Sequence, residues 1–70
     1  MNRAKIKTAL QAPISGREVM TLAEFCKAWG CKDKAYAKRK YGLAELDTID
    51  GRYFVDDLVT AIIRRGYDGS

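Results

Sequence analysis

Apolar residues recur at helical spacing in the stretch TLAEFCKAWG, residues 21–30. Four of them fall at i, i+3, i+4 and i+7 and therefore share one face of a helix: Leu22, Phe25, Cys26 and Trp29. Thr21 and Glu24 have the three-residue spacing of a capping box, which satisfies two backbone donors at a helix start. Gly30 stands where helices commonly end, because glycine adopts the left-handed conformation without strain. The pattern predicts a helix over residues 21–30, with a short strand within residues 17–20 before it.

A second helix is predicted over residues 32–42, with Asp33 as a suitable N-cap and Gly42 as a suitable end. Four side chains share one sector of this helix, which we expect to face outward: Lys34, Ala35, Lys38 and Arg39. The opposite sector holds four more: Tyr36, Ala37, Lys40 and Tyr41. We expect the two tyrosines, with Trp29 of the preceding helix, to belong to the core. The small Ala35 would let the cationic face approach a groove closely.

Residues 46–55 have the pattern of a β-hairpin. Asp50 and Gly51 form a two-residue loop of the kind that favours a type I′ turn, whose twist matches the strands. Such a loop sets three cross-strand pairs: Ile49 with Arg52, Thr48 with Tyr53, and Leu46 with Val55. A lone hairpin is barely stable in water. We therefore expect the side that carries Tyr53 and Val55 to pack against the helices.

A last helix is predicted over residues 56–66. Asp56 is expected to cap this helix. The charge of Asp57 suits the positive, N-terminal end of the helix dipole, and the charges of Arg64 and Arg65 suit its negative, C-terminal end. Four apolar residues make a broad face for the core: Leu58, Val59, Ile62 and Ile63.

Residues 1–16 are expected to form a flexible basic arm. Ile6 and Leu10 have helical spacing and allow a short helix over residues 3–11, but a helix of that length is not stable alone. The three cations of this arm, Arg3, Lys5 and Lys7, suit a minor-groove contact or plain disorder equally well.

Seventy residues suffice for one small domain, which we place at residues 17–66 with a frayed tail over residues 67–70. A hydrophobic content of 47% with 31% charged residues is typical of a globular chain. No apolar run approaches the ~18 residues that a membrane span needs. The N-terminus also lacks the apolar stretch of a secretory signal. We expect a cytoplasmic protein.

The side chains that carry catalysis and metal binding are scarce. Two cysteines and no histidine are too few ligands for a structural zinc site. We interpret Cys26 as a buried apolar residue and Cys31 as a turn residue; a disulfide between them is possible but not indicated. The chain has no glycine-rich phosphate loop and no nucleophile beside a base, and a helix cap explains the adjacent Asp56 and Asp57. We expect neither an enzyme nor a metal or cofactor.

Charge is distributed unevenly along the chain. The net charge is +4, ten of the 13 Lys and Arg precede residue 44, and six of the nine Asp and Glu follow it. Such a distribution is expected where one face meets a polyanion. A solvated basic face without a partner is the alternative.

The expected order is helix, tight turn, basic helix, hairpin, helix. This order predicts a small α+β fold, a winged helix-turn-helix with a two-stranded wing hairpin and a C-terminal helix. In that fold the second helix enters the DNA major groove. Arg52, beside the tip of the wing, suits a narrow A·T-rich minor groove. Lys32 and Lys40 suit phosphates better than bases, because phosphate contacts tolerate imprecise geometry.

Two stretches resemble the excisionase-type winged helices, which share a superfamily with the DNA-binding domain of MerR-like regulators. VMTLAEFCKAWGC is similar to the opening helix of that family, and GRYFVDDL to its passage from wing to last helix. The resemblance covers about two-thirds of the chain, from Val19 to about Ile63. Lys32 stands where the family usually has serine or threonine, and Lys40 lies near a usual isoleucine or leucine.

The resemblance implies a DNA-binding protein of a phage or mobile element in a bacterial host cell. It implies cooperative binding as a homo-oligomer on bent double-stranded DNA, and an integrase or other recombinase partner biased towards excision. Four residues would meet the major groove: Lys34, Ala35, Lys38 and Arg39. Arg52 would meet the minor groove.

Two other functions remain open from the residues. One is a transcriptional repressor of the same fold. The other is a small protein-binding adaptor or antirepressor that uses the winged-helix surface, since a fold does not determine function.

Overall fold

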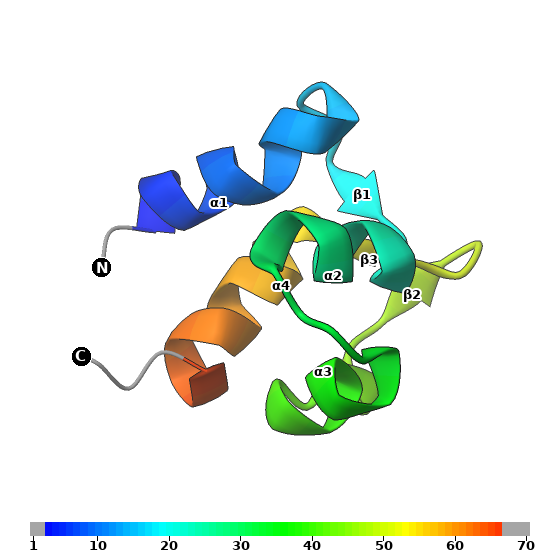
Figure 1. Cartoon of the computed structure of the whole chain (residues 1–70). Coiled ribbons are helices and arrows are strands. Elements are labelled where there is room, and N and C mark those ends of the chain that lie inside the picture. The colour runs from blue at the N-terminus through cyan, green and yellow to red at the C-terminus, as the bar shows by residue number, and fades with distance from the viewer. Residues whose placement is uncertain (1–2, 67–70) are drawn as a thin grey trace.

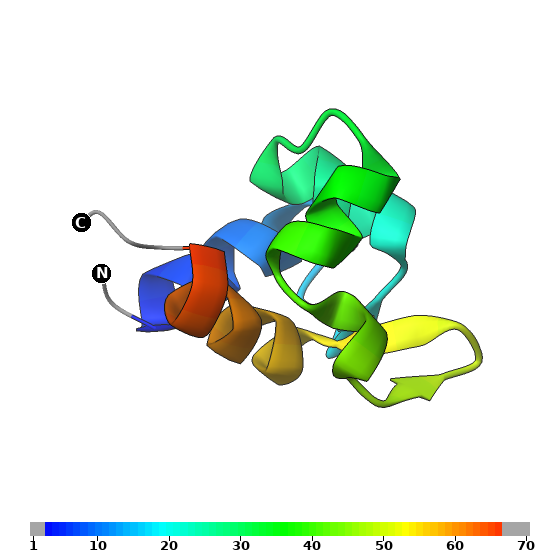
Figure 2. The ribbon, with the colours of Figure 1, turned by 90° about the horizontal axis from the view of Figure 1, so that it is seen from below.

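Short helices pack against one side of a small antiparallel sheet in the computed structural model, which describes residues 3–66 (Figures 1 and 2). The main helices are α1 (Arg3–Gln11), α2 (Leu22–Trp29), α3 (Lys34–Lys40) and α4 (Val55–Ala61). The strands are β1 (Val19–Met20), β2 (Thr48–Ile49) and β3 (Arg52–Phe54). Two 3-10 turns, η1 (Ala12–Ile14) and η2 (Leu43–Glu45), and one π turn, η3 (Ile62–Gly66), complete the described chain. The fold is a small α+β domain.

The start and end of α2 confirm the helix predicted over residues 21–30. Thr21 Oγ1 accepts a hydrogen bond from the backbone N–H of Glu24 at 3.1 Å, and Glu24 Oε1 accepts one from the N–H of Thr21 at 2.8 Å. These two bonds are the predicted capping box. Gly30 ends the helix with φ of 79°, and the N–H of Cys31 donates to the carbonyl of Cys26 at 2.9 Å. The chain is thereby turned sharply towards α3.

Local signals also set the bounds of α3. Asp33 Oδ1 accepts a hydrogen bond from the N–H of Ala35 at 3.1 Å and caps the helix, as predicted. The helix ends at Lys40, and Gly42 reverses the chain with φ of 64°.

The hairpin forms around the predicted turn but is shorter than residues 46–55. Asp50 and Gly51 have φ of 52° and 77°, as a type I′ turn requires. The pairs Ile49 with Arg52 and Thr48 with Tyr53 are confirmed. The third predicted pair does not form, because Val55 already begins α4.

The sheet has three strands rather than the two of the predicted wing, in the order β1-β3-β2. The expected strand within residues 17–20 forms as β1 and pairs with β3, with Val19 opposite Phe54 and Met20 opposite Tyr53. Pairing satisfies backbone groups of β3 that a free hairpin would leave to water. Met20 and Tyr53 are buried and mark the inner side of the sheet.

The prediction of a flexible arm over residues 1–16 is wrong for residues 3–14. Ile6 and Leu10 of α1, and Ile14 of η1, are buried in the core, and α1 packs against α4 and α2 (Figure 1). Burial of this apolar stripe stabilises a helix too short to persist alone. Lys7 reinforces the packing through ion pairs with Asp56 at 3.2 Å and Glu18 at 3.6 Å. Residues 1–2 of the arm, and the tail predicted over residues 67–70, lie outside the described residues.

The last helix begins one residue earlier than predicted, at Val55. Phe54 therefore occupies the cap position without a side-chain hydrogen bond, and the prediction that Asp56 caps the helix is wrong. Asp56 lies in the first turn, where its charge is favourable and where Lys7 pairs with it. The apolar face is confirmed for Leu58, Val59 and Ile62 but not for Ile63, which is exposed. Within residues 3–66, no helix is long and apolar enough to span a membrane.

Candidate functional site

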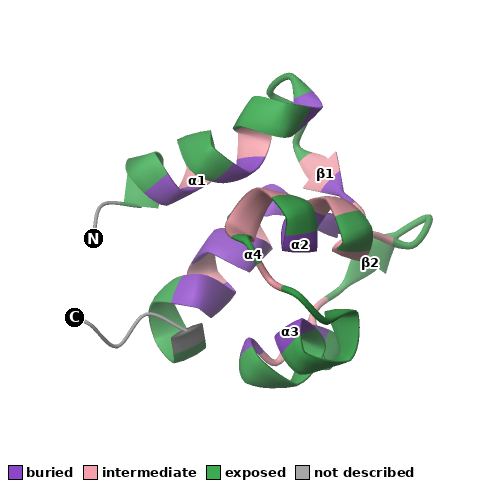
Figure 3. Cartoon of the chain, viewed as in Figure 1, coloured by how far each residue is buried: buried purple, intermediate pink, exposed green. Residues whose placement is uncertain are grey.

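The cations predicted on the second helix lie on the exposed face of α3 (Figure 3). Six predicted site residues are exposed along this helix and just before it: Lys32, Lys34, Ala35, Lys38, Arg39 and Lys40. Ala37 and Tyr41 are buried on the other side and set the rotation of the helix. Since successive residues are about 100° apart around a helix, Ala35 and Arg39 lie opposite this buried pair. The centre of the exposed face is therefore a small residue beside a long cation.

Tyr41 is the buried anchor of α3. Its ring contacts that of Phe25 edge to face, with centroids 5.6 Å apart, and its hydroxyl accepts a hydrogen bond from Trp29 Nε1 at 3.1 Å. The prediction that Tyr41 belongs to the core is confirmed. Trp29 is half-buried and packs against the edge of that core. These contacts hold α3 against α2 at a defined angle.

The prediction that Tyr36 belongs to the core is wrong, since its side chain is 47% exposed. Tyr36 lies about 100° from Ala37 and about 140° from Tyr41 around the helix, so the narrow buried stripe of α3 does not reach it. Lys40 Nζ lies 5.7 Å from the ring centroids of both Tyr36 and Tyr41. Tyr36 thus lies on the exposed face of α3, beside the predicted cations. The angle of about 100° between Tyr36 and Ala37 around the helix is the sequence signal that could have indicated that Tyr36 is exposed.

Three cations of this face have no ion-pair partner within residues 3–65. Within residues 3–65, no carboxylate lies within ion-pairing distance of Lys34, Lys38 or Arg39. Lys7, Arg17 and Arg65 form ion pairs elsewhere in the domain. Positive potential therefore concentrates along α3, where an anionic partner would gain most.

Arg52 lies on the hairpin, which projects from the end of the molecule opposite the start of α1 (Figures 1 and 2). It is half-buried and sits directly opposite Ile49 in the ladder. No carboxylate among residues 3–65 pairs with it. Arg52 is therefore distant from α3 in the chain, but like Lys34, Lys38 and Arg39 it has no carboxylate partner within residues 3–65.

The two cysteines are free thiols that meet at the end of α2. Cys26 is buried, as expected, and Cys31 is half-buried in the turn. Burial, together with the neighbouring Cys26 thiol, raises the pKa of the Cys31 thiol, which makes it less nucleophilic at neutral pH. In the described part of the chain, no three His, Cys, Asp or Glu side chains gather as metal ligands would.

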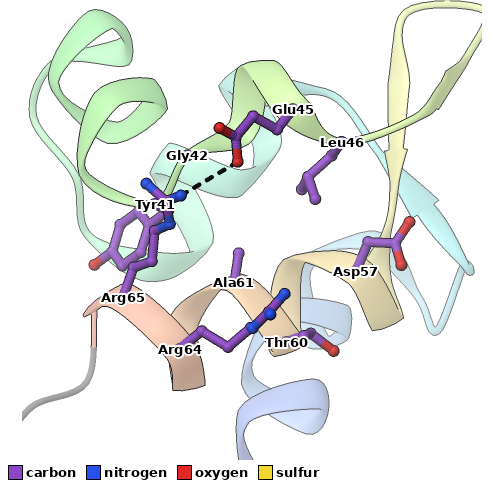
Figure 4. A pocket seen from close by; sticks show the side chains of 9 residues that line it. All are labelled: Tyr41, Gly42, Glu45, Leu46, Asp57, Thr60, Ala61, Arg64 and Arg65. Carbon is purple, nitrogen blue, oxygen red and sulfur yellow. Dashed lines mark hydrogen bonds and ion pairs between the residues drawn. The ribbon is translucent and has the colours of Figure 1, made fainter.

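A pocket of about 430 Å³ lies behind the exposed face, between the end of α3 and α4 (Figure 4). Arg65 Nη2 crosses it to reach Glu45 Oε1 at 3.2 Å. Arg64, Thr60 and Asp57 line the wall formed by α4 and η3. The sequence interpretation did not single out this pocket, because its walls come from segments that are distant in the chain.

Comparison of the chain with protein-family models, with curated proteins and with solved structures finds no match. The structure itself defines the class, a small α+β domain with a cationic exposed helix.

Proposed function

We propose that the protein is a winged helix-turn-helix protein that binds double-stranded DNA without catalysing a reaction. In this proposal α2 and α3 form the helix-turn-helix, and β2 with β3 forms the wing. The observation that supports it most is the positive charge of Lys34, Lys38 and Arg39 on the exposed face of α3, with which no carboxylate of residues 3–65 pairs. Because phosphates supply most of the affinity of such proteins, a face of this kind is the primary requirement for DNA binding.

The geometry of α3 suits the major groove. An α-helix with its side chains is about 10–12 Å across, and the groove, about 12 Å wide, admits one. Ala35 allows close approach, while Arg39 and Lys38 reach base edges from the same face. Lys34 lies beside them, and Lys32 and Lys40 bind the flanking phosphates.

The wing adds a second contact. Arg52 lies next to the turn and carries no carboxylate partner within the described residues. A guanidinium in that position matches the negative potential of a narrow A·T-rich minor groove. The full proposed contact set is Lys32, Lys34, Ala35, Lys38, Arg39, Lys40 and Arg52.

Within this class we propose an excisionase role, as a recombination directionality factor of a phage or mobile element. The resemblance of residues 19–31 and 51–58 to excisionase-type winged helices supports it. Such a role implies cooperative binding by several copies and an integrase partner. A repressor of the same fold would bind DNA in the same way, and an integrase gene beside this one would favour the excisionase role.

A protein-binding adaptor is the second candidate, favoured by the exposed apolar side chains Ile49, Phe54 and Ile63. Salt dependence separates the two candidates. The binding constant for duplex DNA falls with a logarithmic slope of about −0.9 per phosphate contact. An apolar protein interface responds little to salt.

Fluorescence anisotropy with a random-sequence duplex at low and moderate salt tests the proposal. With about five phosphate contacts, raising salt from about 50 to about 200 mM should weaken binding about 500-fold. Absence of binding at low salt would exclude the DNA-binding function and direct attention to protein partners.

A further inference from the structure

The outward face of the sheet is apolar at positions where a solvated face is normally polar. Met20 and Tyr53 point inward and are buried. Residues directly opposite in a ladder share a side, and successive residues alternate between sides. Four residues therefore make up the other side, which we call the outer sheet face: Val19, Ile49, Arg52 and Phe54.

Two large apolar side chains of the outer sheet face are strongly exposed to solvent. Ile49 is 51% exposed and Phe54 is 38% exposed. Antiparallel sheets with one solvated face normally alternate apolar inward and polar outward residues. An exposed apolar patch beside polar residues commonly marks an interaction site.

The part of this face nearest the turn pairs one apolar residue with one cation. Ile49 and Arg52 are directly opposite, and such pairs have Cβ atoms about 4.5–5.5 Å apart. Phe54 lies two residues further along β3, about 7 Å from Arg52 at the usual strand rise. A partner that meets Arg52 therefore meets Ile49 at the same time.

We propose that Ile49 and Arg52 enter the minor groove of duplex DNA together, an inference that rests on the proposed DNA-binding function. The floor of a narrow A·T-rich groove carries the negative potential that attracts arginine. Its walls are deoxyribose rings, whose C–H groups suit an isoleucine. Apolar side chains inserted from the minor groove also unstack base steps and bend the duplex. Ile49 is then the apolar wedge and Arg52 the electrostatic anchor.

A second copy of the chain fits this face less well. In a two-fold symmetric contact the same patch meets itself. The outer sheet face carries a cation and no carboxylate, so two copies of it would bring like charges together with no opposite charge to pair them. A minor groove offers the opposite charge.

Ile49→Thr tests the inference because threonine retains β-branching and strand preference but loses the apolar tip. The matched control is Ile63→Thr, which changes a second exposed isoleucine (40% exposed) on η3, outside the sheet. Each full-length variant is titrated onto an A·T-rich duplex with donor and acceptor dyes at its ends, so that anisotropy reports affinity and energy transfer reports bending. Circular dichroism verifies that both variants fold.

We expect Ile49→Thr to weaken binding about tenfold, the scale of one lost groove contact, and to reduce the bend. The logarithmic slope of its binding constant against salt concentration should equal that of the wild type, because no charge is removed. Arg52→Ala should reduce the size of that slope by about one. Ile63→Thr should match the wild type in every measurement. If Ile49→Thr binds and bends DNA as the wild type does, the wedge is excluded while the DNA-binding function stands. If the wild type binds no duplex, both proposals fail.

Discussion

The guanidinium of Arg65 lies against the backbone of Gly42 and fills the space that a side chain there would need. A Cβ at Gly42 would come within 2.8 Å of Arg65 Cζ. Gly42 also has φ of 64°, which side chains rarely adopt. The contact fastens the turn after α3 to η3, and so helps to orient the exposed cationic face.

Gly42→Ala should destabilise the protein by about 1–2 kcal/mol, because alanine is strained at positive φ, and it should also displace Arg65. The matched control is Gly30→Ala, since Gly30 has φ of 79° but open space around its Cα. Urea unfolding of both variants measures the difference. A Gly42→Ala protein no more destabilised than Gly30→Ala would show that the Arg65 contact contributes nothing.

Leu10→Ala should destabilise the protein by about 2–5 kcal/mol, as expected for a fully buried leucine. Its side chain is 0% exposed in the structure. Thr8→Ala, on the exposed side of α1, should remain within about 0.5 kcal/mol of the wild type. Thermal unfolding distinguishes the two variants. Equal stability of both would mean that α1 does not pack as described.

Glu24→Gln should reduce the dependence of stability on acid pH. The backbone N–H of Thr21, with the side chain of Arg17 at 2.6 Å, lowers the pKa of Glu24 below its ordinary value. A lowered carboxyl pKa contributes stability above the unfolded value of about 4.3, and that contribution is lost as pH falls through the folded pKa. Urea midpoints at about pH 7 and about pH 3 should therefore differ more for the wild type. Glutamine keeps the capping box, so an identical pH dependence would exclude the ionised Glu24 as its source.

Gly51→Val should disrupt the hairpin and cost about 1–2 kcal/mol, because β-branched residues resist φ of 77°. Asp50→Asn is the control, since asparagine tolerates the left-handed region. Chemical shifts of residues 48–54 report the turn. Unchanged shifts in Gly51→Val would contradict the type I′ assignment.

Arg39→Ala and Lys38→Ala should each weaken duplex binding by about 1–3 kcal/mol if their side chains reach base edges. Lys27→Ala is a matched control, because Lys27 is exposed on α2 and lies outside the proposed contact set. Anisotropy titrations of the three variants at one salt concentration make the comparison. Equal affinities would remove α3 from the proposed interface.

Local chemistry made much of this fold predictable. The capping box of α2, the Asp33 cap of α3 and the Asp50-Gly51 turn each depend on residues a few positions apart. Such signals act before any tertiary contact forms. The exposed cations of the candidate site followed from the same helical periodicity.

The sequence by itself determined α2, α3, the turn of the hairpin and the uneven distribution of charge, since caps, periodicity and backbone preferences are local. Only the tertiary structure decided that α1 is ordered, that β1 adds a third strand and that Tyr36 is exposed. Each of those outcomes depends on which distant surface buries a residue. A short apolar stripe becomes a stable helix only when another element covers it, and no local pattern specifies that element.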